Sequence, residues 1–119
     1  MNQVVEIPAE SFNIEVERAD KPVVIEFWIR SCSFCQKFKP IFEKLPKIFA
    51  NKVKFIKMNM FQSLENLKLA EDLGVEDTPT LKLFCYGKEV GEVIGFRSLD
   101  TVVKEIKAIF QHEECHNMR

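Results

Sequence analysis

The chain has 119 residues, with 17 basic and 18 acidic side chains and a formal net charge of −1. Its length suits one domain, and its near-neutral charge excludes the basic surface by which proteins bind nucleic acid. Apolar residues make up 46% of the chain in short runs, which indicates a globular protein without membrane-spanning segments.

The first third of the chain predicts a strand, a helix and a second strand. Residues 4–7 suit a short strand that stops at Pro8, and nothing before them has the basic region and long apolar core of a secretory signal. A helix is expected to begin near Ser11 and to end by 20–22. Residues 23–29 are apolar, β-branched and aromatic, as in a strand buried on both faces.

A helix is expected to follow that strand directly. Apolar side chains recur at helical spacing from Phe38 to Phe49. Pro40 and Pro46 lie inside this pattern, and each removes a backbone donor, so we expect them to kink or split the helix. Asn51 suits a left-handed end.

The second half of the chain predicts two further units. Residues 53–58 read as a strand, and residues 64–73 as a helix ended by Gly74. The remaining elements are two strands joined by a hairpin, followed by an amphipathic helix with Ser98 as its cap. They cover residues 80–86, the turn at Gly87-Lys88, residues 89–94 and residues 99–110.

The predicted order is βαβαβαββα. This order favours an α/β domain with a central mixed sheet, parallel units first and an antiparallel hairpin last, with helices on both faces. We assign residues 1–111 to this single domain and residues 112–119 to a polar C-terminal tail.

Cys32 and Cys35 form a Cys-x-x-Cys motif between a buried strand and a helix. The N-terminus of a helix carries a partial positive charge of about half an electron, which stabilises a thiolate and lowers the pKa of the first cysteine from about 8.5. Cys32 is therefore predicted to attack a substrate disulfide, and Cys35 to resolve the mixed disulfide.

Several motifs lie in the order and spacing of one known family. They are Val24 to Trp28, Cys32-Ser33-Phe34-Cys35, Pro40, Lys57-Met58-Asn59, Thr78-Pro79-Thr80, Gly87 and Gly95. On these residues the chain resembles the thioredoxin family over about residues 4–111.

The resemblance implies a thioredoxin fold and a thiol–disulfide oxidoreductase that reduces protein disulfides through a Cys32–Cys35 cycle. It implies disulfide-containing protein substrates, electrons from a thioredoxin-reductase-type donor, and no metal or organic cofactor. We accordingly expect a cytoplasmic monomer that serves electron transport and redox homeostasis, with no nucleic-acid or membrane partner.

The resemblance also implies roles for individual residues. The Thr78–Pro79 bond is expected to be cis and to lie beside the cysteines, where the backbone of Thr78 pairs with an extended substrate. Glu26 matches a buried acid that relays a proton for Cys35, and Lys57 would tune that acid. The expected substrate-binding residues are Trp28, Ser33, Phe34, Thr78, Pro79 and Gly95.

The chain departs from the usual family pattern near the cysteines. Thioredoxins usually carry Trp-Cys-Gly-Pro-Cys, whereas here Ser31 precedes Cys32 and the central pair is Ser33-Phe34. Phe61 stands where many thioredoxins have an acid. These departures leave two alternatives open: an oxidase- or isomerase-like relative, or a non-catalytic peptide-binding module with this fold.

Other residues have plainer alternatives. The cysteine pair could be half of a zinc site completed by His112, Cys115 and His116, but that spacing is far longer than in compact zinc modules. Glu26 could be a carboxylate at a solvent-facing edge, and Lys57 a surface lysine. Cys85, inside an apolar strand, is predicted to be an inert buried thiol. The expected solvated face of the helix carries Lys37, Lys39, Lys44 and Lys47. Together with Arg30 they leave a basic surface near the cysteines, which would suit acidic partners.

Overall fold

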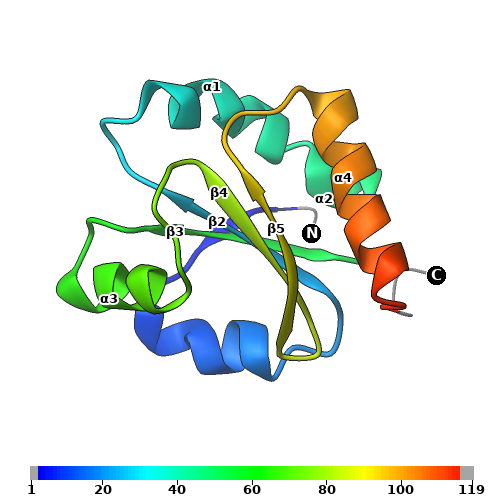
Figure 1. Ribbon diagram of the computed structural model, residues 1–119, viewed down its shortest axis with the longest axis horizontal. Coiled ribbons are helices and arrows are strands. Elements are labelled where there is room, and N and C mark those ends of the chain that lie inside the picture. The colour runs from blue at the N-terminus through cyan, green and yellow to red at the C-terminus, as the bar shows by residue number, and fades with distance from the viewer. Residues whose placement is uncertain (1–2, 116–119) are drawn as a thin grey trace.

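A five-stranded mixed sheet forms the centre of the computed structural model, which describes residues 3–115 (Figure 1). The strand order is β1-β3-β2-β4-β5, with β3 parallel to both β1 and β2, and β4 antiparallel to β2 and β5. The strands are β1 (Val5–Glu6), β2 (Val23–Trp28), β3 (Lys54–Asn59), β4 (Thr80–Cys85) and β5 (Lys88–Ile94). The predicted mixed sheet, with parallel units first and an antiparallel hairpin last, is confirmed.

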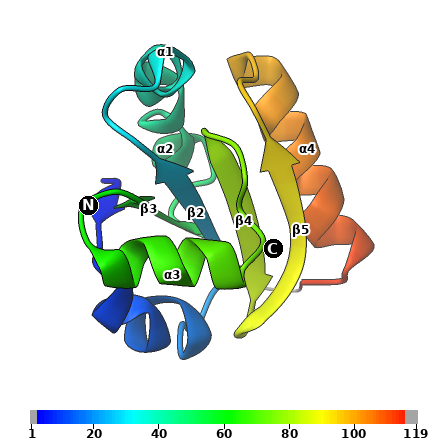
Figure 2. The same ribbon diagram turned by 60° about the vertical axis from the view of Figure 1, so that its left-hand side comes forward.

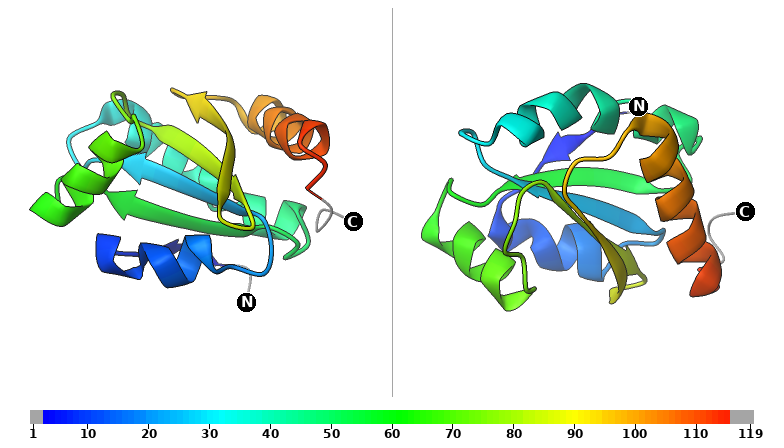
Figure 3. Two further views of the ribbon diagram at one scale, coloured as in Figure 1. Left: turned by 60° about the horizontal axis from the view of Figure 1, so that its bottom comes forward. Right: turned by 45° about the horizontal axis from the view of Figure 1, so that its top comes forward.

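Helices cover both faces of this sheet. One hydrophobic cluster joins the sheet to α1, α2 and α4, and a second joins it to α3 and the N-terminal helical segment. The right-hand view of Figure 3 shows the two groups on opposite sides of the sheet. The helices are α1 (Ser33–Phe42), α2 (Leu45–Ile48), α3 (Leu64–Asp72) and α4 (Leu99–His112), preceded by η1 (Ala9–Ser11) and η2 (Asn13–Glu17).

The helix ends follow the local chemistry of the sequence. Ser63 and Ser98 accept hydrogen bonds from the amides of Asn66 and Thr101, so their side chains cap α3 and α4. The expected split of the helix after the cysteines is present, because α1 ends at Phe42 and α2 begins at Leu45, with Pro46 in its first turn.

Two local expectations need adjustment. The predicted N-terminal helix is a 3₁₀ turn, η1, followed by a π-helical segment, η2, rather than an α-helix. The hairpin turn lies at Tyr86-Gly87, one residue earlier than expected. Both residues have positive φ angles, 51° and 86°, as a two-residue turn that matches the twist of its strands requires.

The prediction that Cys85 is an inert buried thiol is wrong, because Cys85 forms a disulfide with Cys115. Cys115 is 3% exposed and packs into the cluster under α4, so the chain turns back to the core after that helix ends at His112. Of the expected polar tail, residues 112–114 are exposed, whereas Cys115 is buried. α4 lies along β5 (Figure 2), which brings the end of β4 and the C-terminal segment together.

Candidate active site

Cys32 lies at the N-terminus of α1, just beyond the carboxyl end of β2. It is the N-cap residue of the helix, and its Sγ accepts a hydrogen bond of 3.1 Å from the amide of Cys35. Cys32 is partly exposed, whereas Cys35 is 4% exposed. A substrate disulfide can therefore reach the sulfur of Cys32, as the first attack requires. The sulfur of Cys35 is buried, which suits the later resolution of the mixed disulfide.

The same geometry separates the acidities of the two thiols. Burial by itself would raise the pKa of Cys32, but hydrogen bonds at its sulfur with Cys35, Thr78 and the backbone of Phe34 outweigh burial and lower that pKa. Burial and the hydrogen bond with Cys32 raise the pKa of Cys35 to about 11. Cys32 is thus the more acidic of the two thiols, whereas Cys35 stays protonated near neutral pH.

The loop before β4 approaches Cys32 from the opposite side. The Thr78–Pro79 peptide bond is cis, as the sequence predicts. The carbonyl of Thr78 lies 3.5 Å from Cys32 Sγ, and the carbonyl of Pro79 accepts a 2.8 Å hydrogen bond from the amide of Gly95. The structure thus brings Thr78 to Cys32, and Gly95 to Pro79.

Glu26 is buried in the middle of β2 at 1% exposure, so the alternative of a carboxylate at a solvent-facing edge is wrong. Burial raises the pKa of Glu26 to about 7, against the opposing charge of Lys57 and with smaller contributions from Glu6 and Glu43. Its Oε1 has no hydrogen-bond partner among residues 3–115. A carboxyl group with this pKa can accept and return a proton near neutral pH.

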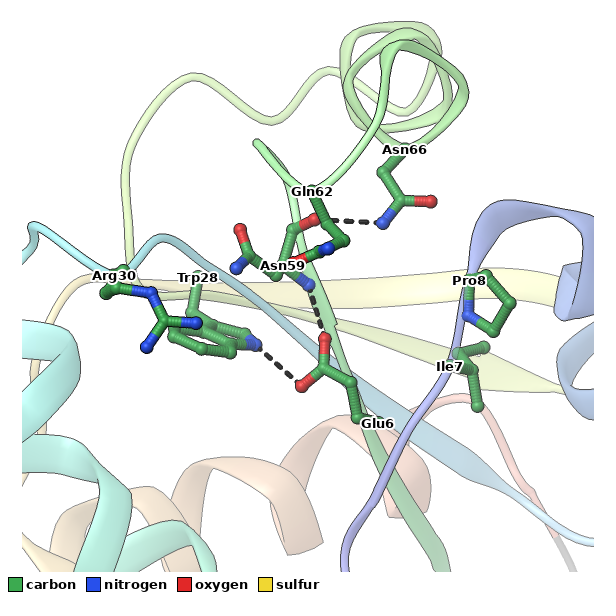
Figure 4. A pocket seen from close by; sticks show the side chains of 8 residues that line it. All are labelled: Glu6, Ile7, Pro8, Trp28, Arg30, Asn59, Gln62 and Asn66. Atoms are coloured by element: carbon green, nitrogen blue, oxygen red, sulfur yellow. Dashed lines mark hydrogen bonds between the residues drawn. The ribbon is translucent and has the colours of Figure 1, made fainter.

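Lys57 pairs in register with Glu26 on β2 and with Glu6 on β1. Its Nζ lies 4.5 Å from the centre of the Trp28 ring, within the range of a cation–π contact. The Trp28 indole in turn donates a hydrogen bond to Glu6 (Figure 4). The sequence analysis missed Glu6, since only the pairing of β1 with β3 places it beside Trp28.

An exposed aromatic pair flanks the N-terminus of α1. Phe34 is 54% exposed, and its ring centre lies 6.3 Å from that of Phe96. Lys37 Nζ lies 5.6 Å from the centre of the Phe34 ring. Phe34 was among the predicted substrate-binding residues, whereas Phe96 was missed because its sequence neighbourhood has no motif. Ser33, another predicted residue, is the first residue of α1.

Cys115, one of the C-terminal residues of the zinc alternative, is not free to bind a metal together with Cys32 and Cys35. The sulfur of Cys115 is bonded to Cys85, and His116 lies outside the described residues. Across residues 3–115, no three His, Cys, Asp or Glu side chains converge as a metal site requires.

We expect iodoacetamide to label Cys32 at least about tenfold faster than Cys35 at pH 7. The lowered pKa of Cys32 and the raised pKa of Cys35 give Cys32 the larger thiolate fraction, which outweighs the weaker nucleophilicity of the more acidic thiol. Mass spectrometry of labelled peptides across a pH series measures both rates. Equal rates, or a Cys32 midpoint at the free-thiol value, would contradict this account.

Comparison with known proteins places these features in one family. A family model described as thioredoxin matches residues 3–108. The thioredoxin of Rickettsia typhi is 36% identical over 89% of this chain and 99% of its own length, and that of Rickettsia bellii is 33% identical over 82% and 90%. The crystal structure of spinach chloroplast thioredoxin f (short form) superposes with a TM-score of 0.80 at 33% identity, covering 91% of this chain and 94% of that one.

Proposed function

This chain belongs to the thioredoxin family and is a thiol–disulfide oxidoreductase, and we propose that Cys32, Cys35 and Glu26 carry its reaction. The observation that supports this most is the sulfur of Cys32, which accepts the amide of Cys35 at a helix N-terminus. The oxidase- or isomerase-like relative and the non-catalytic module are not favoured by these comparisons.

In the proposed first step, the Cys32 thiolate attacks one sulfur of a substrate disulfide. A bond forms between Cys32 and that sulfur, the substrate S–S bond breaks, and the second substrate sulfur leaves as a thiolate that takes up a proton. Cys32 is suited to this step because it is the more exposed and more acidic of the two free thiols.

In the second step, Cys35 loses its proton and attacks the Cys32 sulfur. The mixed disulfide breaks, the substrate leaves with its second thiol, and the enzyme keeps a Cys32–Cys35 disulfide, so two electrons have passed to the substrate. Glu26 is the proposed proton acceptor because its pKa of about 7 leaves a large carboxylate fraction near neutral pH. A dithiol donor of the thioredoxin-reductase type would return the enzyme to its reduced form.

Substrate binding is proposed to use the two sides of Cys32. The backbone of Thr78, next to cis-Pro79, can pair with an extended peptide that carries the disulfide. Phe34 offers an exposed apolar face, and Lys37 beside it offers a positive charge, so acidic segments with an apolar residue near the disulfide fit this surface. Trp28, Ser33 and Gly95 complete the proposed set of binding residues.

We propose a cytoplasmic location, because the bacterial relatives that the chain matches are thioredoxins and a reductase-type donor operates in a reducing compartment. No helix within residues 3–115 is long and apolar enough to cross a membrane.

The proposed function predicts that catalytic amounts of this protein accelerate reduction of insulin disulfides by dithiothreitol. The Cys32→Ser/Cys35→Ser double variant is expected to show only the uncatalysed rate, because both sulfurs of the cycle are gone. Precipitation of the reduced insulin chains reports the rate by turbidity. A double variant as fast as the parent would contradict the assignment.

Glu26→Gln is expected to slow resolution of the mixed disulfide by at least about tenfold at pH 7, since general-base catalysis typically contributes more than this. The first attack should change much less, because the proposed role of Glu26 is to accept the proton of Cys35, which leaves only in the second step. In the parent, the resolution rate should rise with pH through about 7 as Glu26 becomes a carboxylate, and the variant should lack this rise.

Stopped-flow kinetics with a peptide disulfide separates the two steps. Lys57→Gln is the matched control for charge, because it removes the opposing charge near Glu26 while keeping the carboxyl group. Unchanged resolution in Glu26→Gln would make Glu26 a packing residue.

A further inference from the structure

Glu6 uses both oxygens of its carboxylate to hold two different segments. Oε1 accepts a 3.1 Å hydrogen bond from the indole Nε1–H of Trp28, and Oε2 accepts a 2.7 Å hydrogen bond from the amide of Asn59 at the end of β3. Figure 4 shows the carboxylate between the two donors. Glu6 therefore ties the edge strand β1 to the ends of β2 and β3 from which the site is built.

Trp28 forms part of the wall of two cavities. One, of about 310 Å³, is lined by Cys35, Lys57 and Glu43 as well as by Trp28 and Glu6. The other, of about 300 Å³, lies toward Asn59 and Gln62 and is again lined by Trp28 and Glu6. The orientation of the indole therefore sets the shape of the space that reaches the resolving cysteine.

Two side chains hold this indole. Lys57 contacts the face of the ring through its charge, whereas Glu6 accepts a hydrogen bond and so fixes the direction of the N–H bond. We propose that Glu6 is a positioning residue that orients Trp28 as the wall of the Cys35 cavity during resolution of the mixed disulfide. This inference rests on the proposed function for its kinetic consequence, but its geometric part can be measured without any reaction.

Glu6 also belongs to the charges that face Glu26. Lys57 lies between Glu6 and Glu26 in register. Glu43, which follows the end of α1, lines the cavity of about 310 Å³. Cys35, Arg30 and Lys39 line that cavity too. The negative charge of Glu6 disfavours ionisation of Glu26. Loss of that charge is therefore expected to lower the pKa of Glu26, while loss of the hydrogen bond loosens the indole; the two effects can be separated by substitution.

Three variants make this separation. Glu6→Ala removes both hydrogen bonds and the charge. Glu6→Gln removes the charge and keeps one acceptor oxygen, so it can satisfy only one of the two donors. Glu43→Gln is the matched control, because it removes a carboxylate that also acts on Glu26 but has no bond to the indole.

Trp28 is the only tryptophan in the chain, so intrinsic fluorescence reports on this ring alone. With acrylamide as quencher, we expect Glu6→Ala to raise the quenching constant about twofold, as ring access increases on loss of the hydrogen bond. Glu6→Gln should give an intermediate value, and Glu43→Gln the parental one. The rate of mixed-disulfide resolution should fall about fivefold in Glu6→Ala, which corresponds to the loss of one ordinary hydrogen bond.

The pH profile of resolution supplies the second readout. Its midpoint should move to lower pH in Glu6→Ala, Glu6→Gln and Glu43→Gln alike, because each removes a negative charge facing Glu26. The inference would be overturned if both Glu6 variants kept the quenching constant and the resolution rate of the parent. If Glu6→Ala does not fold, the same two measurements on Glu6→Gln decide the question. A parent that reduces no disulfide would instead overturn the proposed function, and the quenching constants would still decide the role of Glu6.

Discussion

Cys35→Ser is expected to accumulate a covalent mixed disulfide between Cys32 and a partner protein, whereas Cys32→Ser is expected to accumulate almost none. The first variant can still attack, but it has lost the resolving sulfur, so the intermediate persists. The second retains only a thiol whose pKa is raised to about 11 and which is 4% exposed. Turnover should fall to the uncatalysed rate in both variants.

Non-reducing electrophoresis after incubation with a cell extract shows the trapped species, and adding dithiothreitol to the gel sample is the control. A zinc site would give a different result, because either substitution would release metal and destabilise the fold without asymmetric trapping. A passive peptide holder would bind its ligand equally well with both cysteines replaced. Symmetric trapping, or stoichiometric zinc in the freshly purified parent, would contradict the redox assignment.

Loss of the Cys85–Cys115 disulfide is expected to lower the free energy of unfolding by about 3–4 kcal/mol. The bond joins residues 30 positions apart, and a crosslink of that span removes a large share of the freedom of the unfolded chain. For a domain of this size, the corresponding decrease in melting temperature is roughly 10–20 °C. Cys115→Ser and Cys85→Ser should each show it.

The double variant Cys85→Ser/Cys115→Ser tests whether the bond itself is responsible. The free energy of unfolding should fall by nearly the same amount in the double variant as in either single variant, because each single variant already breaks the same bond. Thermal unfolding of the three variants and the parent, with and without dithiothreitol, measures this, and the reductant should have its large effect only on the parent. Additive losses, or two titratable thiols in the unfolded parent once Cys32 and Cys35 have been oxidised to their disulfide, would contradict a stabilising disulfide.

This disulfide also tests the proposed cytoplasmic location. Disulfides are rare in the reducing cytosol, but exchange requires a thiolate to reach one of the two sulfurs. Cys115 is 3% exposed, and Cys85 is partly buried against the same hydrophobic cluster. We therefore expect this bond to be reduced more slowly than the Cys32–Cys35 disulfide at the same glutathione concentration. Differential thiol labelling over time gives both rates in one sample.

Local patterns were sufficient for most elements and for the reacting groups. The β-branched run that becomes β2, the helical spacing from Phe38 and the Ser98 cap all act within a few residues, so they can be read along the chain. The Cys-x-x-Cys motif is equally local, because one helix N-terminus supplies the environment of both sulfurs. Glu26 was identified by its match to the buried acid of the family, and its burial agrees with its apolar neighbours in the sequence.

What the sequence alone could not determine depends on contacts between distant segments. Cys85 and Cys115 meet only because α4 lies along β5 and the chain then turns back to the end of β4. Glu6 reaches Trp28 only because the two-residue strand β1 pairs with β3 in one particular register. Sheet order and register arise from the packing of the whole core, which a local pattern does not encode. The sequence by itself therefore determined the chemistry of Cys32 and Cys35, whereas the tertiary structure decided which side chains surround and constrain them.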